Sequence, residues 1–164
     1  MPPPNSFAIP VDQLRKLEFI LGESEGLETL YPPEGPPVQF RANVFGQWES
    51  CERFVRFDFY ANIPGIGIET FRALITYSRD MAAYRMWAFG ASQEEPMHLT
   101  GNFEGTDLIF VSEPTPMIWG LQRLRFTLMP KSDGSVELLG ERWEPHGYVK
   151  YCSVVFTPSE VVSA

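Results

Sequence analysis

Residues 66–89 read IGIETFRALITYSRDMAAYRMWAF and contain the clearest structural signal in the chain. Two segments rich in Ile, Thr, Phe, Tyr and Trp, Ile66 to Tyr77 and Ala82 to Phe89, flank the polar stretch Ser78 to Asp80. β-Branched and aromatic residues favour strands, and a short polar interruption between two such segments favours a tight reversal. This part of the chain therefore predicts an antiparallel β-hairpin.

The same pattern continues on both sides of this hairpin. Further strand-like segments, several with clear period-two alternation, are Ser24 to Tyr31, Val38 to Val44, Val55 to Phe59, His98 to Phe103, Thr106 to Ser112, Leu121 to Met129, Val136 to Trp143 and Tyr148 to Thr157. Strands do not alternate with helices, which favours an antiparallel sheet. About ten short strands in one sheet expose two edges unless the sheet closes. We therefore expect a mainly β protein with a single closed antiparallel barrel, and a two-sheet sandwich is the alternative.

The N-terminal region is different in character. Residues 1–10 form a Pro-rich leader that we expect to be flexible, and residues 11–164 have the length of a single domain. Apolar residues recur at helical spacing from Val11 to Leu21, which predicts one short amphipathic helix that ends at Gly22. Two prolines in Glu113 to Trp119 predict a loop.

Charge and composition exclude several classes of partner. The chain has 13 basic and 21 acidic residues and a net charge of −8, so it lacks the basic face that binding to nucleic acid or an anionic membrane requires. No segment has the composition of a membrane span or a secretory signal, and we expect a cytoplasmic protein. Cys51 and Cys152 are then expected to be free thiols, and they can form a bridge only if their strands are neighbours.

Several short motifs together resemble calycin-like barrels, and in particular the bacterial domain-of-unknown-function family 1579. The motifs are Leu21-Gly22, Gly46-Gln-Trp48, Tyr77-Ser-Arg-Asp80, Tyr84-Arg-Met-Trp87, Leu99-Thr-Gly101, Glu104-Gly-Thr-Asp-Leu108, Asp133-Gly134 and Glu141-Arg-Trp143. The resemblance covers most of the chain. It implies a calycin- or lipocalin-like barrel of about ten strands with a short N-terminal helix, and it specifies fold better than function.

A second set of residues resembles the nitrobindin-type haem barrels. The segment Gly22 to Gly26 and the dipeptide Tyr31-Pro32 are similar to the glycine-rich opening of that family. The family's haem-ligating His lies in the last strand, and Tyr148 to Pro158 contains no His. We therefore expect no haem and no other cofactor. The two histidines, His98 and His146, have no metal-ligand spacing, so we expect no metal site either.

The candidate ligand-binding residues follow from the alternation inside a closed barrel, where every second side chain points inward. One arginine interrupts an otherwise apolar or aromatic phase on three segments, and an inward guanidinium needs an anionic partner. In fatty-acid-binding barrels, which this architecture resembles, inward arginines and tyrosines hold a ligand carboxylate. One alternative is an internal Glu as the partner, and another is that the opposite phase of the strand faces the interior, which the sequence does not decide. The predicted ligand-binding residues are Arg72, Tyr84, Arg85, Trp87, His98 and Arg142.

The sequence leaves three functions open. The first is a non-enzymatic barrel that binds a small hydrophobic or amphipathic molecule, including one that bears a carboxylate. The second is an enzyme on the same barrel, an isomerase, cyclase or hydrolase that uses His98 with a nearby carboxylate, although no catalytic residue is assigned. The third is a filled barrel that acts as an interaction module. A cavity smaller than about 300 Å³ favours the third. The sequence does not decide between a monomer and a homodimer.

Overall fold

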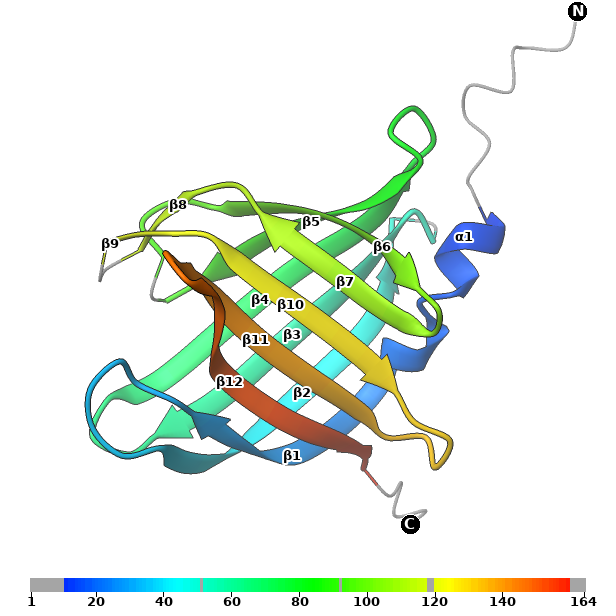
Figure 1. The fold of residues 1–164 in the computed structure, drawn as a ribbon. Helices are drawn as coiled ribbons and strands as arrows, with labels where there is room; N and C mark the ends of the chain where they lie inside the picture. Colours follow the sequence, from blue (N-terminus) through cyan, green and yellow to red (C-terminus); the bar gives the residue numbers. More distant parts are fainter. Residues whose placement is uncertain (1–10, 51, 92, 118–119, 160–164) are drawn as a thin grey trace, which may run out of the picture.

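The computed structural model describes residues 11–50, 52–91, 93–117 and 120–159. The described part of the chain begins with a short helical region and continues as strands (Figure 1). The elements are α1 (Val11–Arg15), the 3-10 helix η2 (Glu18–Ile20), β1 (Gly22–Leu30), β2 (Val38–Glu49), β3 (Phe54–Ile63), β4 (Gly67–Ser78), β5 (Ala83–Gly90), β6 (Met97–Glu104), β7 (Asp107–Ser112), β8 (Thr115–Met117), β9 (Gly120–Gln122), β10 (Leu124–Pro130), β11 (Val136–Glu144) and β12 (Gly147–Pro158).

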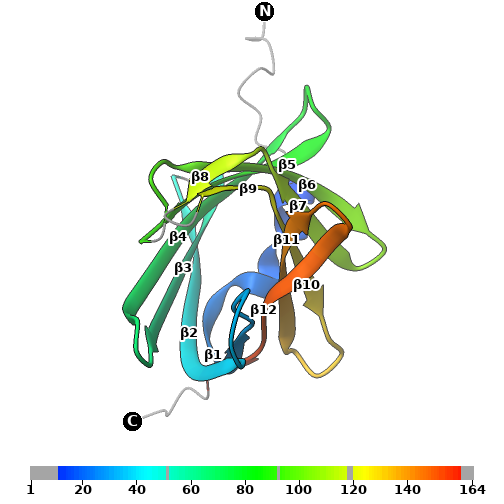
Figure 2. The same cartoon turned by 60° about the vertical axis from the view of Figure 1, so that its left-hand side comes forward.

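Ten of the strands in this part of the chain form one closed barrel, in the order β1-β12-β11-β10-β7-β6-β5-β4-β3-β2. The closure occurs at β1, which pairs with β2 along one edge and with β12 along the other. Every neighbouring pair in the barrel is antiparallel. The two views in Figures 1 and 2 show the sheet curving round until the first and last strands lie side by side. The prediction of a mainly β, closed antiparallel barrel is confirmed.

Alternation along the strands separates the barrel interior from its outer face. On β2, Phe40, Ala42 and Val44 are buried, and the residues between them are exposed. The same alternation produces a continuous apolar core from the inward side chains of the other strands. Because successive side chains of a strand point to opposite faces, one buried residue fixes the orientation of its whole strand.

The N-terminal helical region differs from the expected single helix. It divides into α1 and η2, and Gly22 is the first residue of β1 rather than the end of a helix. Leu14 of α1 and Leu17, which lies between the two short elements, are both in the core at 1% and 0% exposure. The Tyr84 hydroxyl on β5 donates a hydrogen bond of 2.5 Å to the backbone oxygen of Gln13. This contact ties the helical region to the barrel wall.

One glycine allows η2 to enter the end of the barrel. A Cβ atom at Gly46, on β2, would overlap the backbone oxygen of Ile20. Ile20 is itself only 6% exposed, so η2 is seated tightly at this end of the barrel. The motif around Gly46 therefore has a packing role.

Two other segments differ from the barrel strands. Within Glu113 to Trp119, expected to be a loop, residues 115–117 form β8, which pairs with β9 in a separate two-stranded sheet. Residues 1–10, predicted to be a leader, lie outside the described residues. Among the helices of the described segments, none has the length and apolar composition needed to cross a membrane.

We predict that Gly46→Val destabilises the protein by about 1–3 kcal/mol, because the added side chain displaces Ile20 from the barrel end. Chemical denaturation monitored by circular dichroism measures the change. Asn43→Val, at an exposed position of the same strand, is the matched control and is expected to change stability little. Equal effects of the two substitutions would contradict the role assigned to Gly46.

Candidate functional site

The barrel encloses a cavity of about 590 Å³. Apolar and aromatic side chains make up most of its wall, and the lining residues come from the helical region and from strands all round the barrel. They are Ile20, Glu28, Leu30, Phe40, Phe57, Phe59, Ile63, Ile66, Ile68, Glu69, Phe71, Ile75, Met86, Ala91, Phe110, Phe126, Leu128, Leu138, Tyr151 and Cys152. A volume of several hundred Å³ with a mainly apolar wall is typical of a small-molecule site.

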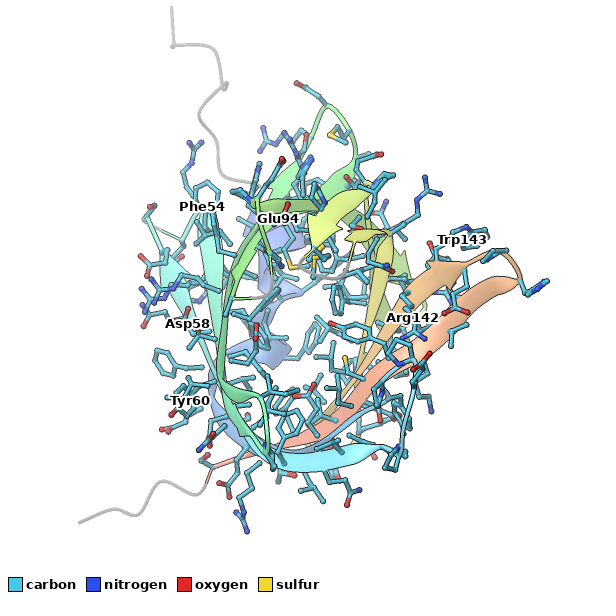
Figure 3. The ribbon with its side chains drawn as sticks, turned by 90° about the vertical axis from the view of Figure 1, so that its left-hand side faces the viewer. Phe54, Asp58, Tyr60, Glu94, Arg142 and Trp143 are labelled. Carbon is cyan, nitrogen blue, oxygen red and sulfur yellow. The ribbon has the colours of Figure 1, made fainter. Side chains whose placement is uncertain are left out.

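The cavity has a closed end and an open end. Ile20 of η2 lines the closed end, beside β2. At the opposite end, Ile66 in the β3–β4 turn and Ile68 at the start of β4 line the cavity although they are 67% and 62% exposed. Figure 3 looks toward this open end and shows the helical region behind the hollow interior. These two isoleucines therefore border the opening of the cavity.

Glu28 is the most unusual residue of the cavity wall. It lies on β1 opposite Phe40 on one side and Val154 on the other, and it is only 7% exposed. Its Oε2 atom is buried and has no hydrogen-bond partner. Burial raises the pKa of Glu28 from 4.5 to about 7, and the nearby charge of Glu69 also acts to raise it. A carboxyl group in an apolar wall is costly unless it is protonated or paired.

Two polar groups of β12 lie next to Glu28. The Cys152 side chain lies close enough to the Glu28 carboxyl, and the Tyr151 hydroxyl close enough to Cys152, for each group to influence the pKa of its neighbour. Both residues line the cavity because the β11–β12 pairing shifts register between Gly140 and Glu141. A Cβ atom at Gly140 would overlap the Cys152 sulfur and lie 2.9 Å from Cε1 of Tyr151. Gly140 thus makes room for this polar pair.

The ionisable Asp, Glu, Lys, Arg and His residues among the described residues of the cavity wall are all acidic. Glu28 and Glu69 are both acidic, and the described lining residues include no Arg, Lys or His. Glu69 lies on β4 opposite Ala61, which is 1% exposed. The wall therefore presents carboxyl groups to a ligand and no guanidinium or ammonium group. This result is the opposite of the arginine-anchored site expected from the sequence.

The structure places Tyr84 inside the barrel but away from the cavity. Its side chain is 1% exposed, and its ring packs edge-on against Tyr77 and Phe103. Burial raises the pKa of Tyr84 to about 12, and its hydroxyl bonds to Gln13 of the helical region. The contacts of Tyr84 are those of a core residue that holds α1.

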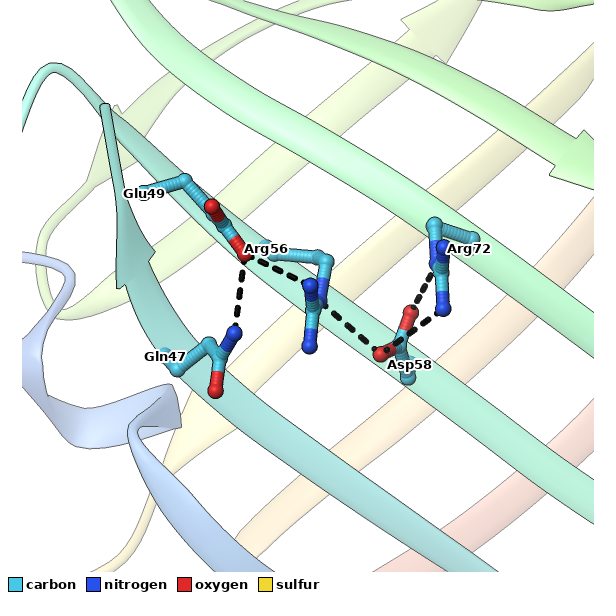
Figure 4. A network of polar contacts seen from close by, with 5 residues as sticks. All are labelled: Gln47, Glu49, Arg56, Asp58 and Arg72. Atoms are coloured by element: carbon cyan, nitrogen blue, oxygen red, sulfur yellow. Dashed lines mark hydrogen bonds and ion pairs between the residues drawn. The ribbon is translucent and has the colours of Figure 1, made fainter.

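Arg72 lies on the outer face of β4, with 60% of its side chain exposed. The inward residues of this strand are Phe71, Ala73 and Ile75, so Arg72 lies on the opposite face and does not line the cavity as predicted. The Arg72 Nε atom lies 2.6 Å from Asp58 Oδ1. Figure 4 shows this pair within a surface network that also contains Arg56 and Glu49, and Figure 3 shows Asp58 on the outside of the barrel.

Arg85, Trp87 and His98 lie together, but on the outer face of β5 and β6. The inward residues of β5 are Tyr84, Met86 and Ala88. The Arg85 guanidinium contacts His98 Nε2 at 3.1–3.2 Å and lies 4.8 Å from the Trp87 ring centre, and the Trp87 and His98 rings stack. Burial and the Arg85 charge lower the pKa of His98. Of the two phases that the sequence left open on β5, the one with Tyr84 faces inward, and Arg85, Trp87 and His98 do not line the cavity.

Among the three predicted arginines, Arg142 is the one whose side chain lies on the inner face of the sheet. The register pairs it with Leu124, which is 2% exposed, so both side chains lie on the same face of the sheet. The neighbouring Trp143 is 48% exposed and points outward (Figure 3). The Arg142 Nε atom lies 2.9 Å from Glu144 Oε1 near the β11–β12 turn. Arg142 does not line the cavity.

Other reactive or metal-binding groups add little to the site. Among the described residues, no group of three or more His, Cys, Asp or Glu side chains is placed to hold a metal ion. Cys152 is buried and is a free thiol, and burial raises its pKa. Cys51 lies outside the described residues.

The closed ten-stranded barrel with a short N-terminal helix is a calycin-like fold. A similar solved structure is the crystal structure of Rv2717c from M. tuberculosis, with a TM-score of 0.63 and 11% sequence identity. The match covers 90% of this chain and 97% of that one. At this identity the similarity establishes the fold alone. No protein-family model matches the chain, and no curated protein matches it by sequence. Membership of family 1579 therefore stays a prediction.

We predict that Glu28 makes stability depend on pH. The pKa of Glu28 is about 7 in the folded protein and 4.5 when the residue is exposed. Between these two pH values the folded protein keeps a proton on Glu28 that the unfolded chain releases. The contribution of the neutral carboxyl to the free energy of unfolding is complete below pH 4.5. It falls as pH rises and levels off above about pH 7. The stability of Glu28→Gln relative to the wild type should therefore increase by about 3 kcal/mol over this interval.

Urea denaturation at a series of pH values measures this difference. The control is Glu25→Gln, which removes one acidic group from an exposed position of the same strand. Its stability relative to the wild type should change little with pH. A flat difference curve for Glu28→Gln would show that Glu28 is not buried in the folded protein.

Proposed function

We propose that the protein binds a small, mainly apolar molecule inside the barrel. The observation that carries this proposal is the cavity of about 590 Å³, which has an apolar wall and an open end. Core packing normally leaves few voids larger than a water molecule, so a cavity of this size is a built feature of the barrel and not an ordinary packing defect.

The shape and chemistry of the cavity support a ligand with an apolar body. Aromatic side chains from several strands, among them Phe57, Phe59 and Phe126, supply flat surfaces round the interior. The few polar groups include Glu28, Tyr151 and Cys152, which lie together. Sites for small molecules commonly combine a large apolar wall with a small number of polar groups that fix the ligand's orientation.

The two alternative functions receive less support. A filled barrel would have a cavity below about 300 Å³, and the observed volume is about twice that. An enzyme that uses His98 needs this residue at the cavity, whereas His98 lies on the outer face and contacts Arg85 and Trp87. A binding barrel is therefore the function that the geometry favours.

The proposal predicts saturable binding of the neutral apolar dye Nile red, with a fluorescence increase that 1-octanol reverses. Leu138→Trp places a larger side chain in the cavity and should weaken dye binding by about tenfold or more, because the added ring occupies the dye's volume. Fluorescence titration measures the affinities, and circular dichroism verifies that the variant is folded.

The next residue along the same strand provides the control. Leu139 lies on the opposite face of β11, so Leu139→Trp introduces the same side chain outside the cavity. Its dye affinity should remain within about twofold of the wild type, a change below about 0.5 kcal/mol on the affinity scale. Equal affinities for the two tryptophan variants would place the dye outside the barrel and refute the proposal. If Leu138→Trp does not fold, Phe59→Trp makes the same test with a smaller increase in volume.

A further inference from the structure

We infer that the ligand is an amphipathic cation, with an apolar body in the barrel and an ammonium group that donates a hydrogen bond to Glu28. This inference rests on the proposed function and names the chemical class of the ligand. It replaces the carboxylate-bearing ligand expected from the sequence.

The first argument is the unpartnered oxygen of Glu28. The residue is only 7% exposed, it lines the cavity, and its Oε2 atom has no hydrogen-bond partner in the protein. A buried acceptor without a donor is destabilising, and a donor supplied by a ligand removes that cost. When Glu28 is ionised, both of its oxygens are acceptors, and the ligand group next to Oε2 must then be a donor.

The second argument concerns the charge of the surroundings. The groups that face Glu28 are Glu69 from β4 and Tyr151 and Cys152 from β12. None of these carries positive charge, and the described lining residues include no base. Among the described lining residues, the groups that an ammonium ion can meet as charges are therefore the two carboxyl groups. A carboxylate in the same place would meet these two carboxyl groups and no basic lining residue of the described chain.

The third argument is the field of the whole protein. The chain has a net charge of −8, and two of the three arginines predicted to bind the ligand are paired with carboxylates instead, Arg72 with Asp58 and Arg142 with Glu144. A strongly negative protein attracts cations and repels anions at long range. Long-range attraction and the local hydrogen bond thus favour the same ligand charge.

Proton release is a consequence of this arrangement. Without a ligand, Glu28 holds its proton up to about pH 7, because burial and Glu69 raise its pKa. An ammonium group favours the ionised carboxylate, so binding expels the proton from Glu28. Affinity for the cation should therefore increase as pH rises toward about 7 and remain constant above that value. Affinity for a neutral ligand should not increase in this way.

Three probes with the same apolar chain test the inference: octylamine, 1-octanol and octanoate. At pH 8, calorimetry on the wild-type protein should give an affinity for octylamine about tenfold or more above that for octanol, with octanoate weakest. Glu28→Gln should remove the preference for the amine and leave the octanol affinity within about threefold. Glu25→Gln changes the net charge equally at an exposed position and should keep the preference.

The outcomes separate the two proposals. If octanol binds the wild type as tightly as octylamine does, or if Glu28→Gln keeps the preference for the amine, the inference is wrong and the binding barrel still stands. If none of the three probes binds, both proposals are wrong. If Glu28→Gln does not fold, the pH dependence of octylamine affinity in the wild type decides the question. An increase toward pH 7 for the amine alone supports the inference, and a flat profile overturns it.

Discussion

The pairing of β1 with both β2 and β12 is the constraint on which the rest of the structure depends. Because β1 is hydrogen-bonded along both edges, the barrel sheet has no free edge and its wall is continuous from strand to strand. The same pairing fixes which residues of β1 turn inward. It places Glu28 between Phe40 and Val154, and a carboxyl group thereby becomes part of an apolar wall.

The ends of the barrel determine how the interior can be used. The helical region fills one end, where Ile20 is seated against Gly46 and Tyr84 bonds to Gln13. The other end has no such cover among the described residues and is bordered by Ile66 and Ile68. A barrel closed at one end and open at the other has a single direction of access, so its polar groups can fix the orientation of a bound molecule.

The sequence predicts the strands well and their orientation poorly. Period-two alternation and turn residues locate the ten barrel strands. The sequence does not identify the inward face of β4 and β5, because both faces of these strands carry large side chains. Trp87 and Phe89 are outward, and their neighbour Arg85 contacts His98 there, so alternation alone cannot identify the inner face. Glu28 was missed because β1 carries three glutamates and nothing local distinguishes the buried one; only its pairing with the apolar positions of β2 and β12 does so.

The central claim is that Glu28 is a buried, protonatable group in the wall of an apolar cavity. Carbon-13 NMR titration of the glutamate side-chain carboxyl signals tests it most directly, with Glu28→Gln used to assign the resonance. The structure predicts a midpoint near pH 7 for Glu28 in the ligand-free protein. A midpoint near the ordinary value of 4.5 would mean that water reaches this carboxyl freely, and it would contradict the burial of Glu28 in the cavity wall.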